Sequence, residues 1–244
     1  SEVRFVMPGD DRTVDGFDVD SRVSGASDAE GCSKPDNRAP DGRTGIDNQF
    51  AGLLPLAAAQ LGDLDGFVNA QVTLGQLSYI FDVRPTDDSA CAFLMQSTDG
   101  QVLVDSAEQV IPYQTVALST ERTSTRGTCE ETAPCEWTAT GGRFEMPFTF
   151  LGTPIHIALD PYIFRMRMAD DGSIDVLVGG SMPLPDVDIF LQALDGDGTT
   201  RQIKEQVQGL IPVIADMFPG DDGKCTGISA ALRFRAVPAY VYED

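Results

Sequence analysis

Hydrophobic and polar residues alternate most regularly between residues 143 and 181, and this pattern predicts antiparallel β-strands. The residues Asp170-Asp171-Gly172 predict a three-residue loop between two of these strands, with the glycine in the left-handed conformation. That loop sets Met166 opposite Val176 and Arg167 opposite Asp175. The apolar faces of the strands before the loop are formed by Phe144, Met146, Phe148 and Phe150, by Ile155, Ile157 and Leu159, and by Tyr162, Phe164, Met166 and Met168.

Apolar residues at helical spacing mark several further segments. Thr44 followed by Asp47 resembles a capping box and predicts a helix that continues to Leu61 and bends at Pro55. Other helices are expected at residues 67–74, in the segment LPDVDIFLQAL after Pro185, and in a longer segment capped by Thr199 or Thr200.

These elements together predict an α+β fold. We expect a mostly antiparallel, meandering β-sheet with amphipathic, proline-kinked helices packed on one face. Residues 44–244 are expected to form a single domain, because a chain of this length is sufficient for one substantial core.

Residues 8–48 differ from the rest of the chain, because they hold ten acidic side chains and few apolar ones. Such a segment buries too little apolar surface to offset the entropy of its own ordering. We therefore expect an acidic, Asp-rich arm over residues 1–43. It is either a disordered tail or a segment held by cations, by Cys32 or by docking on the domain.

The charge balance excludes some classes of partner. The chain has 38 acidic and 17 basic side chains, a formal charge of −21. This excludes a nucleic-acid-binding protein that works by neutralising phosphates and argues against an anionic membrane surface as the main partner. The sequence also lacks the run of ~20 apolar residues that a membrane-spanning helix requires, so no transmembrane segment is expected.

The cysteine pattern favours an exported protein. Cys129 and Cys135 flank a short loop that contains a proline, and we predict a disulfide between them, which persists in oxidising compartments. None of the five cysteines has metal-ligand spacing. Because their number is odd, one partner is expected either upstream, such as the anchoring cysteine of a lipoprotein, or not at all, as a buried free thiol.

The acidic leader offers the clearest candidate for a cofactor, a calcium ion. Calcium takes six to eight oxygen ligands, and three aspartates of the segment VDGFDVD lie within one turn-rich loop. The alternative is a solvated acidic tail that promotes solubility. The candidate ligands are Asp15, Asp18, Asp20, Asp36, Asp41 and Asp47.

Four arginines form the second candidate site, a contact for an anion or a partner. Arg165 and Arg167 lie on the polar face of one expected strand, and Arg233 and Arg235 lie on that of another. If the two strands are neighbours, the arginines form a basic ladder on which the acidic leader itself docks. Ordinary cross-strand ion pairing is the alternative.

The sequence carries no catalytic signature. His156 is the only histidine, and no G-x-S-x-G motif accompanies it, so we assign no catalytic residue and interpret His156 as structural. The aromatic and methionine stripe from Phe144 to Met168 is expected to form core. Alternatively, it lines a cavity for an apolar ligand between the sheet and the helices.

The order of GIDNQFAGLLP, LSYIFDV and LVGGSMPLPDVDIF, preceded by an Asp-rich leader with a cysteine, resembles a group of acidic exported proteins. These proteins, often lipoproteins, occur in myxobacteria-like bacteria. The resemblance implies export to the periplasm, the outer surface or the extracellular space. No activity is established for the group, so no catalytic residue is carried over.

Two functions are carried forward from the sequence. The first is an exported, non-enzymatic structural or interaction protein with a calcium-binding leader, whose partners are other protein subunits or surface components. The second is a periplasmic or surface carrier of a lipid-like hydrophobic ligand. A hydrolase that uses His156 is the least favoured alternative. A large apolar cavity favours the carrier, whereas a filled core with an ordered arm favours the interaction protein.

Overall fold

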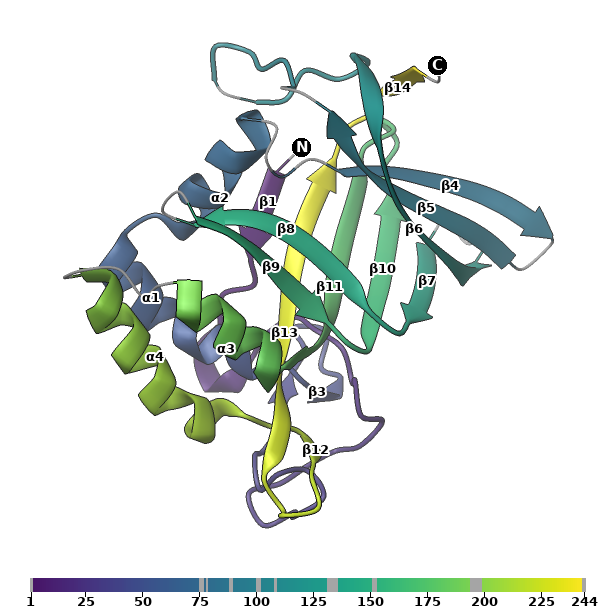
Figure 1. Ribbon diagram of the computed structural model, residues 1–244. Helices are drawn as coiled ribbons and strands as arrows, with labels where there is room; N and C mark the ends of the chain where they lie inside the picture. Colours follow the sequence, from purple (N-terminus) through teal and green to yellow (C-terminus); the bar gives the residue numbers. More distant parts are fainter. Residues whose placement is uncertain are drawn as a thin grey trace.

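The computed structural model describes residues 2–74, 77, 79–87, 90–99, 102–107, 109–130, 136–150, 153–193 and 199–242. In this part of the chain a ten-stranded, mostly antiparallel sheet forms the body of the molecule (Figure 1). Eight of its strands follow the order β1-β13-β11-β10-β7-β6-β5-β4, while β12 pairs with β13 and β14 pairs in parallel with β6. Their bounds are β1 Glu2–Phe5, β4 Tyr79–Asp87, β5 Ala90–Asp99, β6 Thr115–Glu130, β7 Glu136–Gly141, β10 Tyr162–Met168, β11 Ile174–Pro183, β12 Met217–Pro219, β13 Cys225–Ala236 and β14 Tyr240–Tyr242.

The predicted hairpin register is confirmed. Met166 lies opposite Val176, and Arg167 lies opposite Asp175 on the other face of the β10–β11 pair. Gly172 has a φ of +77°, as the three-residue loop requires. Apolar side chains of β10 and β11 alternate into the main core, where Phe164, Met166 and Val178 are almost fully buried.

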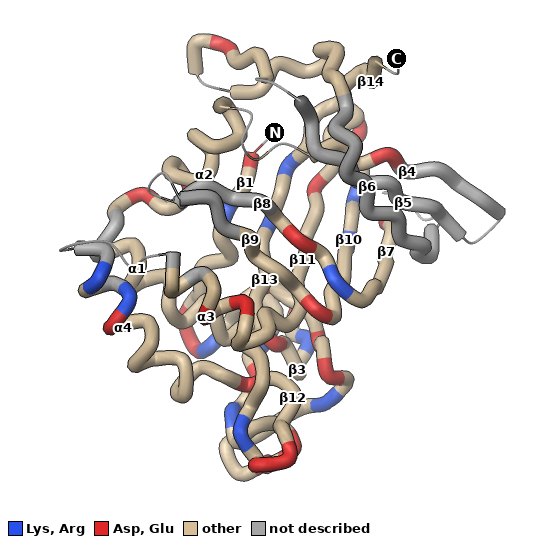
Figure 2. Tube along the Cα trace, in the orientation of Figure 1, with Lys and Arg blue, Asp and Glu red and all other residues tan. Residues whose placement is uncertain are grey.

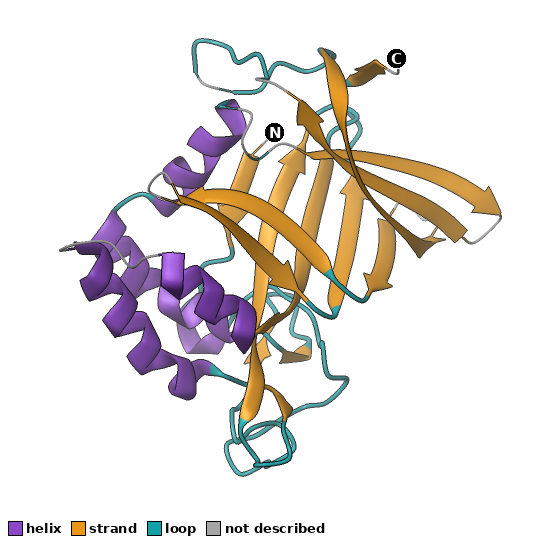
Figure 3. Cartoon of the chain, viewed as in Figure 1, coloured by secondary structure: helices purple, strands orange, loops and turns teal. Residues whose placement is uncertain are grey.

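One side of the sheet is covered by helices and by a separate hairpin (Figure 3). Strands β8 (Phe144–Phe150) and β9 (Thr153–Leu159) pair with each other rather than with the main sheet. The helices are α1 Leu54–Leu61, α2 Leu64–Thr73, α3 Leu184–Ala193 and α4 Thr199–Ile214. The expected α+β class is therefore confirmed. No helix in the described residues is both long enough and apolar enough to cross a membrane.

The helix expected from Thr44 to Leu61 is wrong in its first half. Thr44 begins the short strand β3 (Thr44–Ile46), which pairs with β2 (Asn37–Arg38), so it does not cap a helix. A 3₁₀ helix over Gln49–Leu53 follows, and α1 begins at Leu54. Pro55 lies in the first turn of α1, where its missing N–H has no helical partner to lose, so it does not bend the middle of the helix.

The acidic leader packs on the opposite face of the sheet. Residues 2–5 form β1, which pairs with β13, and a 3₁₀ turn follows at Asp10–Arg12. Val14 and Phe17 are buried against Leu177 and Ala231 of the sheet. Among the alternatives left open by the sequence, the leader is therefore docked on the domain in this structure.

Candidate ligand-binding cavity and acidic leader

An apolar cavity of about 240 Å³, here called the helix-side cavity, lies between the sheet and the helices. Its walls include Val3 of β1, Leu54 of α1, Phe67 of α2, Leu210 of α4 and Ile228 of β13. Apolar residues of α1, α2 and α4 are held at this position because each helix turns its hydrophobic stripe toward the sheet. The cavity is thus built from side chains of several elements and not from one motif.

Three polar side chains interrupt this apolar lining within the described residues: His156 of β9, Asp186 of α3 and Gln206 of α4. Asp186 accepts two hydrogen bonds from the Arg143 guanidinium, at 2.9 and 3.1 Å, so its charge is compensated. Leu56 also lines the cavity and is 43% exposed, which shows that the wall reaches the surface at α1. A mostly apolar space with a few polar groups is the arrangement typical of small-molecule sites.

His156 is exposed and lies at the rim of this cavity. Most of the residues with described burial in the stripe from Phe144 to Met168 form core, as expected. Phe144, Tyr162 and Phe164 contact one another at ring-centroid distances of 5.2 to 5.8 Å. Among the described aromatic and methionine residues of the stripe, Met146 also lines the cavity.

The four arginines are arranged differently from the basic ladder that is expected if their two strands are neighbours. Strands β10 and β13 are both neighbours of β11 and not of each other, so Arg165 and Arg233 face the same side with Leu177 between them. Their backbones are therefore two strand spacings, about 10 Å, apart. In Figure 2, basic and acidic positions lie side by side on these central strands.

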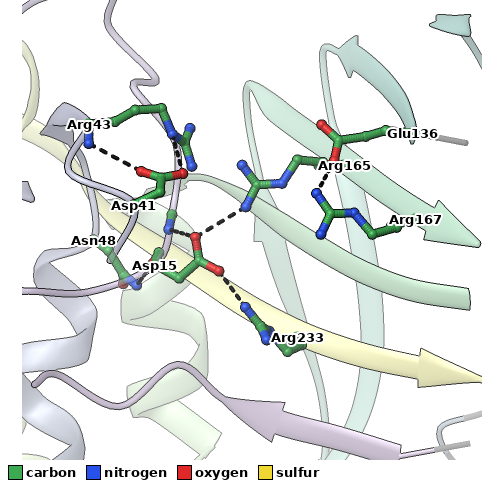
Figure 4. A network of polar contacts seen from close by, with 9 residues as sticks. Asp15, Asp41, Arg43, Asn48, Glu136, Arg165, Arg167 and Arg233 are labelled. Atoms are coloured by element: carbon green, nitrogen blue, oxygen red, sulfur yellow. Dashed lines mark hydrogen bonds and ion pairs between the residues drawn. The ribbon is translucent and has the colours of Figure 1, made fainter. Parts of the chain in front are cut away.

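Asp15 of the leader bridges the two arginines (Figure 4). One carboxylate oxygen lies 3.1 Å from Arg165 Nη2, and the other accepts a hydrogen bond from Arg233. The Arg165 guanidinium also lies over the Phe17 ring, 5.4 Å from its centroid. The Asp15 side chain is only 14% exposed, so this pairing compensates a largely buried charge.

The other two arginines have separate partners. Arg167 Nη2 lies 2.8 Å from a carboxylate oxygen of Glu136 on β7, and Arg235 Nη2 lies 3.6 Å from Asp171 in the hairpin loop. Both guanidinium groups are more than half exposed, so these pairs contribute little to stability. The pairing of Arg167 is thus with the strand on the other side of β10 and not with Asp175.

Three of the six predicted metal ligands come together. One carboxylate oxygen from each of Asp18, Asp20 and Asp47 lies within 4.8 Å of the others. Asp15 is instead engaged by the arginines, and Asp41 accepts a hydrogen bond of 2.8 Å from Arg43 Nε. Asp36 accepts a hydrogen bond from the Ser24 N–H. The leader therefore does not form a single six-aspartate cage.

Asp47 is the buried member of the group, with 4% of its surface exposed. Its Oδ2 accepts hydrogen bonds from the N–H groups of Val19, at 2.7 Å, and Asp20, at 3.3 Å. Burial raises the pKa of Asp47 to about 8, since the two hydrogen bonds do not replace the lost hydration. Burial also raises the pKa of Asp20.

A second buried carboxylate, Asp216, lies in the segment before β12. It accepts hydrogen bonds from the N–H, at 2.7 Å, and the hydroxyl of Ser229, and burial raises its pKa to about 6. The Ser229 Oγ in turn accepts a hydrogen bond of 2.8 Å from the Gln49 N–H. This group has no signature in the sequence, since Gln49 lies far along the chain from Asp216 and Ser229.

A disulfide joins Cys32 of the leader to Cys225 at the start of β13, 193 residues later. The two Cα atoms are 5.9 Å apart. This pairing was left open by the sequence. The predicted Cys129–Cys135 bond lies outside the described residues.

No family model, curated protein or solved structure matches this chain.

Proposed function

We propose that this protein is an exported, non-enzymatic carrier that binds a lipid-like apolar ligand in the helix-side cavity. The observation that carries this proposal is the cavity itself, about 240 Å³ of space lined by apolar side chains of the sheet and of the helices α1 to α4. Burying apolar ligand surface there is favourable at roughly 25 cal/mol per Å². His156 and Gln206 at its wall provide partners for the polar end of an amphiphile.

The location of the protein is argued from its covalent chemistry. The Cys32–Cys225 disulfide holds the leader to the sheet, and such bonds persist in oxidising compartments. This supports export to the periplasm, the outer surface or the extracellular medium.

The carrier function is tested with Leu56, which lines the cavity from a partly exposed position. Leu56→Trp is expected to lower the affinity for dodecanoate, measured by displacement of a fluorescent fatty acid, because the indole fills space at the rim. Val213→Trp is the matched control, since Val213 is 59% exposed and is absent from the cavity lining. Absence of binding by the wild type, or equal affinities of both variants and wild type, contradicts the proposal.

A second proposal concerns the leader: Asp18, Asp20 and Asp47 bind calcium, which orders this segment. The proximity of their three oxygens supports it, and backbone carbonyls and water would complete the coordination. Such an ion would favour the ionised form of Asp47, whose pKa is raised in its absence. Other protein subunits remain candidate partners for the surface that the leader forms.

The calcium proposal is tested by the thermal midpoint with saturating calcium and with a chelator. Calcium is expected to raise the midpoint by mass action, and more so at pH values above neutrality, where fewer protons compete for Asp47. Asp18→Asn with Asp20→Asn should abolish the shift. Asp41→Asn should leave it intact, because Asp41 is paired with Arg43. Identical melting of chelated and calcium-loaded wild type would refute calcium binding here.

A further inference from the structure

A second cavity, here called the loop-side cavity, lies next to the helix-side cavity and has a volume of about 230 Å³. It is formed by the start of β4, by the segment from Val102 to Val116 and by residues 237–239 after β13. Apolar side chains such as Phe81 and Val110 line much of it, and Gln114 and Arg235 are among its polar members.

Three described residues line both cavities: Val3 of β1, Leu77 and Phe234 of β13. They are 4%, 5% and 7% exposed. Val3 and Phe234 are direct cross-strand partners, so their side chains stand beside each other on the face that bears the core. Because the same side chains contact both spaces, the partition between the cavities is a single layer of side chains.

The three residues that the two cavities share are all apolar. Side chains move between staggered rotamers, so these three can move aside when an apolar group takes their place. The polar lining residues are not shared: Gln206 and His156 line only the helix-side cavity, whereas Gln114 and Arg235 line only the loop-side cavity.

We infer that the two cavities are the two halves of one channel that takes a single long acyl chain, with Val3, Leu77 and Phe234 as the gate between them. This inference rests on the proposed carrier function and specifies its ligand class as long, single-chain amphiphiles such as fatty acids. A short acid fits in the helix-side cavity alone, whereas a long one passes the gate and fills both halves.

The channel is tested with a series of fatty acids: octanoate, dodecanoate, hexadecanoate and eicosanoate. Ile111 lines only the loop-side cavity and is 39% exposed, so a larger side chain is tolerated there. Ile111→Trp is expected to lower hexadecanoate affinity by at least about tenfold, since each excluded methylene costs about fourfold. Octanoate affinity should not change. Ile189→Trp is the matched control, because Ile189 is 61% exposed and lines neither cavity.

A second measurement does not depend on a variant. Hexadecanoate with a diazirine at its methyl end is photolysed in the wild-type protein, and the labelled peptides are mapped by mass spectrometry. Octanoate with the same diazirine at its methyl end is the reference. The short acid should label residues of the helix-side cavity, and the long acid should label residues of the loop-side cavity. Equal effects of Ile111→Trp on all chain lengths, or labelling confined to one cavity, would overturn the channel and leave the carrier intact. Failure of every fatty acid to bind would overturn both.

Discussion

At the scale of single residues, Asp47 places a carboxyl group in the interior with two backbone N–H donors and two aspartates of the leader beside it. Its ordinary pKa of 3.8 is raised to about 8, chiefly by burial. The folded state therefore holds a proton on Asp47 over a pH range in which the unfolded chain has released it. The free energy of unfolding must then depend on pH in that range.

The sign follows from the raised pKa. The stabilising contribution of protonated Asp47 is full below about pH 4 and is lost as the pH rises through about 8. Without calcium, the free energy of unfolding of the wild type should fall by up to ~1.4 kcal/mol per pH unit across this range. Asp216 adds to the slope below about pH 6.

Asp47→Asn keeps an acceptor oxygen for the two N–H groups and has no proton to lose. Urea denaturation between about pH 6 and pH 8 should therefore give a flatter pH dependence for this variant than for the wild type. Asp41→Asn is the control, because Asp41 is exposed and hydrogen bonds from Arg43 lower its pKa, so it releases its proton below this range. Equal slopes for the wild type and Asp47→Asn would show that Asp47 is already ionised in the folded state.

At the scale of elements, the leader and the sheet meet through Phe17 and Gly179. The ring of Phe17 is 6% exposed and lies on β11, where a Cβ on Gly179 would approach Phe17 Cδ2 to 2.7 Å. Real Cβ atoms do not come this close to another carbon atom. The missing side chain at Gly179 therefore leaves the space that the Phe17 ring occupies. The Arg165 guanidinium also lies against the Phe17 ring, and an ion pair with Asp15 holds Arg165 in place.

Gly179→Ala is expected to destabilise the protein by ~1–3 kcal/mol, because the methyl group displaces Phe17. Phe17→Ala makes room, so the double variant should be less destabilised than the sum of the two single variants. Gly142→Ala is the control, since a Cβ there meets nothing within 4 Å. Strict additivity in denaturant unfolding would show that the two residues do not interact.

Elements that depend on local pattern were predictable, and those that depend on distant partners were not. The β10–β11 register follows from alternation and from the left-handed Gly172, both readable within one segment. Thr44 carried a convincing local helix signal, yet pairing of β3 with β2 overrides it. In the candidate site, Asp18, Asp20 and Asp47 are among the six ligands predicted from the sequence, but only the fold shows that these three, without Asp15, come together. The cavity had no sequence signature, because its walls come from five or more separate elements.

At the scale of the whole molecule, the sheet separates the helix-side cavity from the acidic leader. One face is covered by the helices and the β8–β9 hairpin (Figure 1), and residues of these elements line the helix-side cavity. The leader joins the sheet through the pairing of β1 with β13, and its later residues lie on the other face, where the ion pairs of Asp15, the small apolar cluster around Phe17 and one disulfide hold them. A leader with so little apolar surface should depend strongly on the covalent link.

Replacement of both Cys32 and Cys225 by serine tests that dependence. The disulfide closes a loop of 193 residues, and its loss should lower the free energy of unfolding by about 2–5 kcal/mol, because the unfolded chain regains conformational freedom. Trypsin should also cut faster after Arg22 and Arg38 in the leader, while sites in the helices and the sheet stay protected. Thermal melting and timed proteolysis with mass spectrometry measure both effects. Reduction of the wild type, which also opens the predicted Cys129–Cys135 bond, should lower the melting temperature at least as far as the double replacement does. If the double variant melts like the wild type and its leader is cut no faster, then the bridge from Asp15 to Arg165 and Arg233, together with the burial of Phe17, suffices to hold the leader on the sheet.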